Sequence, residues 1–432
     1  MNENHFQNGA PQEHPADMAD RLQGMTPEEA ARQLRALPTE RAAAALAEMD
    51  STAAHRIADE LSSADLHPML DAMPHNKAAD ILGELPEERQ REALARLAPE
   101  NSSGVQRLLS YPENSAGSLM SDAFYALRED WTLEYALESL RRDDDAQRLS
   151  ASYLYVVDSQ NRLAGVVTLR DLILRRRDLT VSAIAQPTVQ RVRASDDQET
   201  VARLFSQYRF LSLPVVEADG RLVGVVSADQ AIRVEQAEAT EDMQLMVGLS
   251  GEERTYTPWA QSFSRRLPWL MVNLGTAFLA AAVVGIFEDT IAQWTALAVF
   301  LPIVAGQGGN AGAQTLTVMI RGMAMGEVND AAGRRALLKE ITLGVLNGLA
   351  LGLVVGVVGY WWKGNAMLGV VVCVAMFLNM LAAAFSGVTI PLLLRSLHID
   401  PALASSIFLT TVTDVAGFFF FLGLAALALR FQ

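Results

Sequence analysis

Five long apolar segments follow residue 267, and they constrain the fold more than any other feature of the sequence. Each is near or above the ~20 residues that a helix needs to cross a bilayer. Residues 268–432 contain only seven Lys/Arg and seven Asp/Glu, so this part of the chain is electrically neutral. The sequence therefore predicts an all-α transmembrane unit of five helices, at residues 268–287, 293–320, 337–360, 367–394 and 402–429.

The remainder of the chain carries the net charge. Of the 35 basic and 50 acidic residues, 28 and 43 precede residue 268, which accounts for the whole formal charge of −15. This acidity argues against nucleic acid as a partner, because phosphate backbones are bound by lysine and arginine. One cysteine excludes a disulfide scaffold. Residues 1–24 are polar, with Pro11 and Pro15 and no apolar run, so we expect a disordered tail there and no secretory signal.

Basic residues indicate how the membrane unit is oriented. Arg265 and Arg266, the loop between the second and third segments, and Arg395 alternate with loops that are poor in basic residues. By the positive-inside rule we expect the N-terminus in the cytosol and, after five crossings, the C-terminus outside. The sequence thus predicts a multi-pass protein of the cell (inner) membrane with lipids around it.

A repeat of twelve residues follows the predicted tail. An apolar residue recurs seven times at this spacing, each time just before a helix-start signal. The seven are Met25, Leu37, Met49, Leu61, Met73, Leu85 and Leu97. Short Ala/Leu-rich helices cannot bury an apolar face alone, so such units stack on one another. We therefore expect residues 25–110 to form an all-α superhelical domain, as a scaffold rather than a binding site.

A longer repeat predicts two α/β units in tandem. Residues 155–168 return as residues 214–227, and each copy reads as a strand, a tight turn and a strand beside helical stretches. Over residues 111–234 this resembles a pair of CBS domains, which commonly bind adenine nucleotides. The resemblance implies that Thr168 and Asp171 hold a nucleotide such as ATP; a helix N-cap pair is the alternative. The second copy departs from the pattern, with Ser227 and Gln230 in the matching places.

Asp414 is the acidic residue that lies in the middle of a predicted membrane segment. A carboxylate near the bilayer centre costs roughly 2.5–3.5 kcal/mol, so it normally faces a bundle interior, a water path or an ion. On a helical projection it shares one arc of about 100° with four small or hydroxyl residues. These are Ser406, Thr410, Thr413 and Gly417. The pattern favours a hydrated cation path over a buried structural aspartate.

The second apolar segment contains an unusual polar and glycine-rich stretch. Residues 302–315 include Pro302, four glycines, Asn310 and Gln314. Glycine and proline loosen a helix or allow close helix packing, and exposed carbonyls occur at membrane depth only where they line a cavity. Carbonyl oxygens and the amide of Asn310 are ligands that Mg²⁺ or Ca²⁺ prefers. The stretch therefore indicates ion handling in addition to packing.

Together these features resemble the MgtE family of magnesium channels over nearly the whole chain after the tail. The most specific stretches are residues 111–120, 238–242, 308–314 and 400–417. The resemblance implies a homodimer with a pore on its axis. It also implies that Asp414 coordinates hydrated Mg²⁺ in the last helix and that Asn310 matches the asparagine of the second helix. Residues 235–267 then correspond to a connecting (plug) helix and linker, and residues 268–432 to the pore domain.

The resemblance further implies gating, in which Mg²⁺ draws the cytosolic domains together and the connecting helix closes the pore. An acidic soluble half suits this, because carboxylates that repel one another at low Mg²⁺ are bridged at high Mg²⁺. The candidate ligands are Glu217, Asp229, Glu235, Glu238, Glu241 and Asp242. The alternative for each of them is a solvated helix face.

Two other functions stay open at this point. One is a carrier that couples divalent cation flux to Na⁺ or H⁺, and the other is a membrane-tethered Mg²⁺ or nucleotide sensor without a pore. An enzyme is disfavoured, because the sequence contains no nucleophile–base pattern, phosphate loop or cluster of metal-ligand residues.

Overall fold

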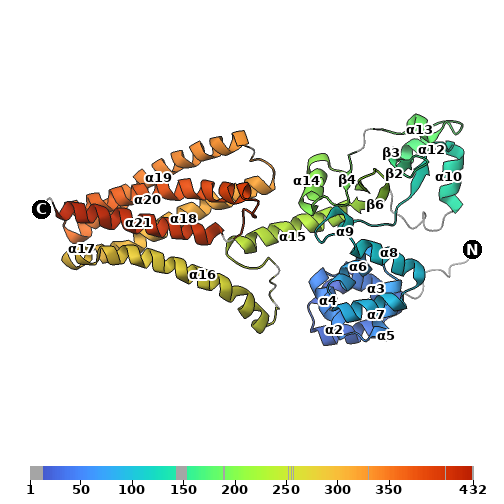
Figure 1. The fold of residues 1–432 in the computed structure, drawn as a ribbon, viewed down its shortest axis with the longest axis horizontal. Coiled ribbons are helices and arrows are strands. Elements are labelled where there is room, and N and C mark those ends of the chain that lie inside the picture. The colour runs from blue at the N-terminus through green and yellow to red at the C-terminus, as the bar shows by residue number, and fades with distance from the viewer. Residues whose placement is uncertain are drawn as a thin grey trace, which may run out of the picture. The chain divides into compact units, whose positions relative to one another are not determined.

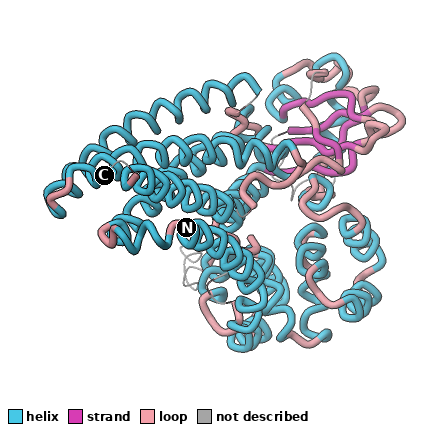
Figure 2. Tube along the Cα trace, turned by 60° about the vertical axis from the view of Figure 1, so that its left-hand side comes forward, coloured by secondary structure: helices cyan, strands magenta, loops and turns pink. Residues whose placement is uncertain are grey.

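The computed structural model describes residues 13–142, 153–187, 190–251, 253, 255, 257–328, 330–403 and 405–430. Two compact units divide the chain, residues 1–235 and 236–432, and each is described here by itself. Strands occur in the first unit, whereas the described part of the second is helices and their connections (Figures 1 and 2). The predicted order of all-α, α/β and all-α parts is confirmed.

Short helices that begin every twelve residues form the start of the first unit. They are α1 (Pro15–Gln23), α2 (Pro27–Arg35), α3 (Thr39–Glu48), α4 (Ser51–Glu60), α5 (Ser63–Asp71), α6 (His75–Gly83), α7 (Glu87–Arg96) and α8 (Pro99–Leu109). Each helix from α1 to α6 packs against the helix two places further along the chain. Thr26, Asp50 and Ser62 accept hydrogen bonds from backbone N–H groups in the first turns of α2, α4 and α5. The predicted superhelical stack is confirmed.

The predicted disordered tail is wrong for residues 15–23, which form α1. Met18, Ala19 and Leu22 of this helix are buried in the same core as the later helices. Its polar residues lie on the opposite side, so the stretch is polar on average although it has one apolar face. The repeat was hidden because Glu13 stands where an apolar residue is expected. Residues 1–12 lie outside the described residues.

Two three-stranded sheets make up the α/β pair. In each, the first strand runs parallel to the second and the second antiparallel to the third. The sheets are β1 (Ala126–Arg128), β2 (Tyr153–Val157) and β3 (Leu163–Thr168), then β4 (Val192–Arg193), β5 (Ser212–Val216) and β6 (Leu222–Ser227). The helices are α9 (Ala116–Leu119), α10 (Leu133–Arg142), α12 (Leu169–Leu174), α13 (Val181–Ile184), α14 (Gln198–Tyr208) and α15 (Ala228–Met246).

The two copies meet through matching turns. Leu163 N–H donates to Gly220 O and Leu222 N–H donates to Asn161 O, each at 3.0 Å. Tyr155 is buried between the sheets, and its hydroxyl lies 2.7 Å from Ser212 Oγ. This pseudo-symmetric pairing agrees with the tandem that the repeat predicted.

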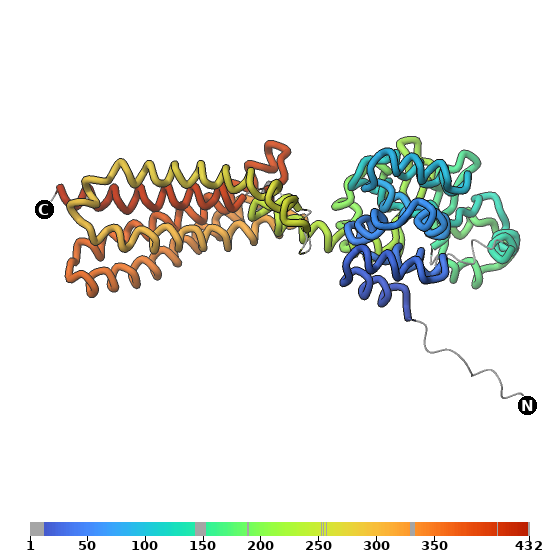
Figure 3. The backbone as a smooth tube through the Cα atoms, turned by 90° about the horizontal axis from the view of Figure 1, so that it is seen from below, coloured from blue at the N-terminus to red at the C-terminus, as the bar shows by residue number. Residues whose placement is uncertain are grey.

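Long helices that run side by side form the second unit (Figure 3). They are α16 (Trp259–Ile286), α18 (Leu297–Ala324), α19 (Asp330–Lys363), α20 (Ala366–Ser396) and α21 (Ser405–Leu429), with the short α17 (Glu288–Gln293) after α16. Among them α20 is central, because it packs against α18, α19 and α21. Within the described residues, four helices are long and apolar enough to cross a membrane: α16, α19 from Gly333, α20 and α21.

The fifth predicted crossing corresponds to α18, which has 28 residues but does not meet the same apolar criterion. Its polar and glycine-rich stretch lowers the hydropathy, while its apolar residues, such as Phe300 and Leu316, are fully buried. Contact with α20 and α21 covers much of the helix. The crossing by α18 stays a prediction.

Candidate functional site

Asp414 lies in the middle of α21 and is half-buried. Among the residues that the structure describes, its carboxylate has neither a hydrogen-bond partner nor an ion-pair partner. Thr410, one turn earlier on the same side, is exposed. A carboxylate in an apolar helix needs water, a cation or a second polar surface to solvate it. This carboxylate is therefore available for such a partner.

The polar stripe predicted on α21 is only partly open. Thr413 is fully buried and its hydroxyl donates to Leu409 O and Thr410 O of its own helix. Gly417 is buried against α20, and Ser406 donates a hydrogen bond to Met246 O. The predicted lining role is therefore wrong for Thr413 and Gly417, because these residues face neighbouring helices. Thr410 and Asp414 remain on the open side.

A second polar stripe lies on the exposed side of α18. Five polar residues of this helix are exposed and fall on one arc of about 80°. They are Gln307, Asn310, Gln314, Thr317 and Arg321. The opposite side of α18, with Gly308, Gly312 and Thr315, is buried in the bundle. Amide side chains are poorly solvated by hydrocarbon, so this stripe requires water or another protein surface.

The two polar surfaces lie on helices that touch at the same level. A Cβ built on Gly309 would lie 4.0 Å from Thr413 Oγ1, and one built on Gly312 would lie 2.8 Å from a methyl carbon of Leu409. Asn310 follows Gly309 and Asp414 follows Thr413 in the chain. The structure thus places the two predicted ion-handling residues on adjoining turns of packed helices.

Sequence reasoning missed Asn379, which is fully buried in α20. Its Nδ2 donates to Val304 O of α18 at 2.9 Å, whereas its Oδ1 is buried and has no hydrogen-bond partner in the described part of the chain. Gly308 of α18 and Gly417 of α21 lie directly against this amide. An amide within the apolar segment 367–394 was the signal that could have revealed it.

Glu340 was also missed, because it lies near the start of a predicted segment. It is 6% exposed in α19, and it accepts a hydrogen bond of 2.8 Å from Thr315 Oγ1 of α18. Lys339 Nζ lies 3.0 Å from its other carboxylate oxygen. A buried carboxylate with both a hydroxyl and an ammonium partner is a satisfied group that joins α18 to α19.

The predicted nucleotide residues form a helix N-cap pair. Asp171 N–H donates to Thr168 Oγ1 at 3.1 Å, and the Thr168 hydroxyl donates to Asp171 Oδ2 at 2.7 Å. In the second copy, Gln230 Oε1 accepts from both Ser227 N–H and its hydroxyl, and Gln230 Nε2 donates to Leu119 O. The side chain of Gln230 is thus engaged in hydrogen bonds within the fold, whereas the side chain of Asp171 is accessible.

Of the candidate sensor residues in the first unit, two already have partners. Tyr111 donates a hydrogen bond of 2.7 Å to Glu217, and Asp229 pairs with Arg233 at 3.2 Å. Glu235 is exposed on α15. Two of these three carboxylates are therefore already engaged by other side chains of this unit.

The other three candidates follow on α15 in the second unit. Glu238, Glu241 and Asp242 are half-buried, and Glu241 lies against Gly251. No group of three or more His, Cys, Asp or Glu in the described part of the chain is arranged to hold a metal ion. The described part of one chain therefore contains no ready-made acidic metal cage.

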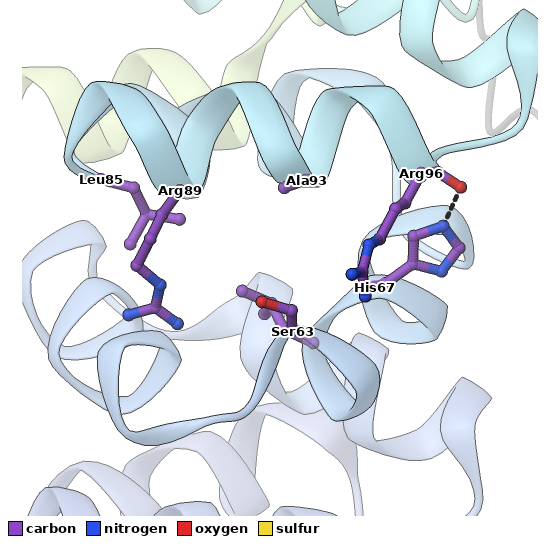
Figure 4. A pocket seen from close by; sticks show the side chains of 7 residues that line it. Ser63, His67, Leu85, Arg89, Ala93 and Arg96 are labelled. Atoms are coloured by element: carbon purple, nitrogen blue, oxygen red, sulfur yellow. Dashed lines mark hydrogen bonds between the residues drawn. The ribbon is translucent and has the colours of Figure 1, made fainter.

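A small pocket lies between α5 and α7 of the helical stack (Figure 4). Polar side chains from Ser63, His67, Arg89 and Arg96 reach it. Two of these side chains connect neighbouring repeats. His67 forms a hydrogen bond with Arg96 O, and Arg89 donates to Asp59 and to Leu61 O. The pocket is therefore a packing feature of the scaffold.

Family models match three parts of the chain. A model described as "MgtE intracellular N domain" matches residues 13–114. The CBS domain model matches residues 116–178 and 181–236. A model described as "Divalent cation transporter" matches residues 301–424.

Characterised relatives share much of the sequence. The chain is 36% identical over 325 residues to the magnesium transporter MgtE of Bacillus subtilis, covering 75% of this chain and 72% of that protein. It is 39% identical over 339 residues to the magnesium transporter MgtE of Thermus thermophilus, covering 77% and 74%. A crystal structure of the cytosolic domain of the Mg²⁺ channel MgtE in complex with ATP is 36% identical, with a TM-score of 0.48, and covers 52% of this chain and 91% of that one.

Proposed function

Because the chain belongs to the MgtE family of magnesium transporters, we propose that it is a Mg²⁺-selective channel that mediates magnesium uptake. One observation carries the proposal. The half-buried Asp414 of α21 has no partner among the described residues and lies beside α18, whose exposed side bears Gln307, Asn310 and Gln314. These surfaces are suited to water and a cation and not to lipid tails.

We propose that two copies of the chain complete the pathway. Mg²⁺ dehydrates reluctantly and is usually held by one or two carboxylates together with waters. Two Asp414 side chains across a twofold axis would supply that charge, with the Asn310 amides as neutral oxygen ligands for the hydration shell. Without a cation the two carboxylates would repel one another, which favours occupancy by a divalent ion.

Gating by Mg²⁺ at the cytosolic domains is the second part of the proposal. The part of the chain before residue 268 carries the whole net charge of −15, so its domains repel at low Mg²⁺ and are drawn together when the ion screens or bridges them. We infer that its carboxylates are bridged between domains or between copies. The ligands proposed are Glu217, Asp229, Glu235, Glu238, Glu241 and Asp242.

ATP is the proposed nucleotide at the CBS pair, with Asp171 as the ribose ligand. The accessible carboxylate of Asp171 supports this, whereas Gln230 in the second copy is tied to Leu119 O. Calorimetric titration with ATP should detect one site per chain that Asp171→Asn weakens and Gln230→Ala does not. Unchanged ATP binding in Asp171→Asn would restrict the residue to helix capping.

The membrane unit makes this a multi-pass membrane protein. We propose that it resides in the cell (inner) membrane with its N-terminus in the cytosol and its C-terminus outside, and that α18 crosses as the fifth helix. The basic loops around Arg265, Arg334 and Arg395 support this orientation.

Mg²⁺ uptake into sealed proteoliposomes tests the channel directly. Asp414→Asn removes the charge and keeps the shape, so Mg²⁺ flux should be lost. Glu288→Gln, which removes a carboxylate from an exposed position of the same unit, should conduct like the wild type. No Na⁺ and no pH gradient should be present.

Three results would change the conclusion. Flux that needs Na⁺ or a proton gradient would make the protein a coupled carrier. Wild-type flux in Asp414→Asn would remove this residue from the pathway. Absence of flux in the wild type at low internal Mg²⁺, with intact binding of Mg²⁺ or ATP, would indicate a membrane-tethered sensor.

A further inference from the structure

Three helices of the membrane unit meet at the side chain of Asn379. This residue is fully buried in α20, and its Nδ2 donates a hydrogen bond of 2.9 Å to Val304 O, 75 residues away in α18. A Cβ built on Gly308 would lie 2.8 Å from Asn379 Cγ, and one built on Gly417 would lie 3.1 Å from the same atom. Only glycine lets α18 and α21 approach the amide this closely.

Burial of the Asn379 amide costs free energy that an apolar side chain at the same position would not cost. A buried polar group without its hydrogen bonds destabilises a fold, and Asn379 Oδ1 has no hydrogen-bond partner among the residues that the structure describes. Its buried neighbours on the same helix, Ala375 and Ala383, fill similar positions with methyl groups. A polar side chain at this place is therefore explained by what its N–H group does, namely the bond to α18.

The contact lies level with the proposed pathway. Gly308 precedes Asn310 by two residues, and Gly417 follows Asp414 by three. A shift or rotation of either helix at Asn379 would therefore move the pathway residues, which lie within one turn of these glycines. Because α18 and α21 both contact this one amide, it couples the orientation of one helix to that of the other.

We propose that Asn379 is a positioning residue of the cation pathway, which holds α18 and α21 in register so that Asn310 and Asp414 face it together. The proposal rests on the proposed function for the role of these two residues. The register itself is a structural property and can be measured in protein that does not transport.

Disulfide trapping measures the register without any flux. The double variant Gly309→Cys/Thr413→Cys places two thiols close together. A Cβ built on Gly309 lies 4.0 Å from Thr413 Oγ1, the atom that the second thiol replaces. A disulfide can span this separation after small adjustments. Cys373→Ala removes the native thiol. In this background, in the full-length protein in lipid, Asn379→Ala should slow cross-linking about tenfold, the factor that corresponds to 1.4 kcal/mol.

Two further variants separate the hydrogen bond from volume and from general loss of polarity. Asn379→Leu keeps a branched side chain of similar size without the N–H donor, so it should slow cross-linking as Asn379→Ala does. Ser386→Ala is the matched control, because Ser386 is also buried in α20 but its hydroxyl donates within its own helix, to Ala382 O and Ala383 O. Its cross-linking should equal that of the parent.

Transport supplies the second readout. In proteoliposomes, Asn379→Leu should lower Mg²⁺ flux and also the ratio of Mg²⁺ to Ca²⁺ flux, because a misaligned pair of ligands discriminates less by hydration. Ser386→Ala should keep both values. A stability change alone would lower the amount of active protein and leave the ratio unchanged.

The outcomes distinguish this proposal from the proposed function. Wild-type cross-linking in Asn379→Leu and Asn379→Ala overturns the proposal, whatever the flux. Slow cross-linking in both, together with normal flux in Asp414→Asn, supports the positioning of the helices and rejects Asp414 as the pathway ligand. If Asn379→Ala does not fold, Asn379→Leu decides the matter.

Discussion

Tyr111 and Glu217 are joined by a hydrogen bond of 2.7 Å between the phenol hydroxyl and the carboxylate. Tyr111 follows the last helix of the stack, and Glu217 follows strand β5 of the second α/β copy. Burial and the neighbouring carboxylate raise the pKa of Tyr111 to about 12, so the hydroxyl stays protonated and donates at physiological pH. Glu217, a proposed Mg²⁺ ligand, is therefore held by the uncharged hydroxyl of Tyr111 in this structure.

Tyr111→Phe should lower the thermal stability of the first unit, because a hydrogen bond to a charged group contributes about 1.5–3 kcal/mol. It should also release Glu217, so Mg²⁺ should restore more stability in this variant than in the wild type. Thermal unfolding of the full-length protein with and without Mg²⁺ measures both effects. Tyr208→Phe, at an exposed tyrosine of the same unit, should change neither. An equal response to Mg²⁺ in both variants would argue against Glu217 as a ligand.

Leu22→Ala should destabilise the helical stack by about 2–5 kcal/mol, because Leu22 is fully buried in α1. The exposed Asp17 of the same helix is the control, and Asp17→Ala should cost no more than about 0.5 kcal/mol. Hydrogen exchange of residues 15–35 provides the local measurement. If Leu22→Ala were neutral and residues 15–23 exchanged freely, α1 would not be part of the stack.

His75 should make the stability of the first unit depend on pH. Burial lowers its pKa, but hydrogen bonds with Asp122 at 2.8 Å and with Asn101 at 3.1 Å outweigh burial, despite nearby Arg107, so the pKa of His75 is raised above 6.5. The stabilisation is therefore complete below pH 6.5 and is lost as pH rises through the folded pKa. His75→Gln should flatten this slope in thermal unfolding between about pH 5.5 and pH 8.5.

A substitution of Asp122, the hydrogen-bond partner of His75, tests the same pH dependence of stability independently. Asp122→Asn keeps the shape of the acceptor and removes the charge that favours the imidazolium, so the loss of stability with rising pH should be smaller in this variant too. Slopes like that of the wild type in both variants would exclude this pair as its source.

Arg233 of α15 forms an ion pair with the helical stack. It lies 3.6 Å from Glu48 and 3.2 Å from Asp229, and both pairs are partly exposed, so each contributes at most about 1 kcal/mol. Arg233→Glu should replace this attraction with repulsion that Mg²⁺ can relieve. The variant should therefore gain more resistance to proteolysis on addition of Mg²⁺ than the wild type does.

Charge reversal elsewhere in the same unit controls for net charge. Arg221 pairs with Asp219 on an exposed turn, so Arg221→Glu should alter the overall charge equally without affecting α15. If both reversals respond to Mg²⁺ to the same extent, the effect is general screening and Arg233 has no special role.

Much of the fold was predictable from local patterns. The twelve-residue spacing, the helix caps and the strand–turn–strand repeat each describe neighbours in the sequence, and the apolar segments describe length and hydropathy. The same logic failed for α1, where Glu13 interrupts the apolar spacing. Asp414 was found because a carboxylate in an apolar helix is conspicuous without any knowledge of its neighbours.

The sequence by itself determined which helices and strands form and which of their faces are apolar or polar. Only the tertiary structure decided that Thr413 faces inward, that Glu340 meets Thr315, and that Asn379 lies against both Gly308 and Gly417. Periodicity shows which face of one helix is apolar, but it does not show which distant helix packs against that face. The close approach that glycine permits was therefore visible only once α18, α20 and α21 were packed together.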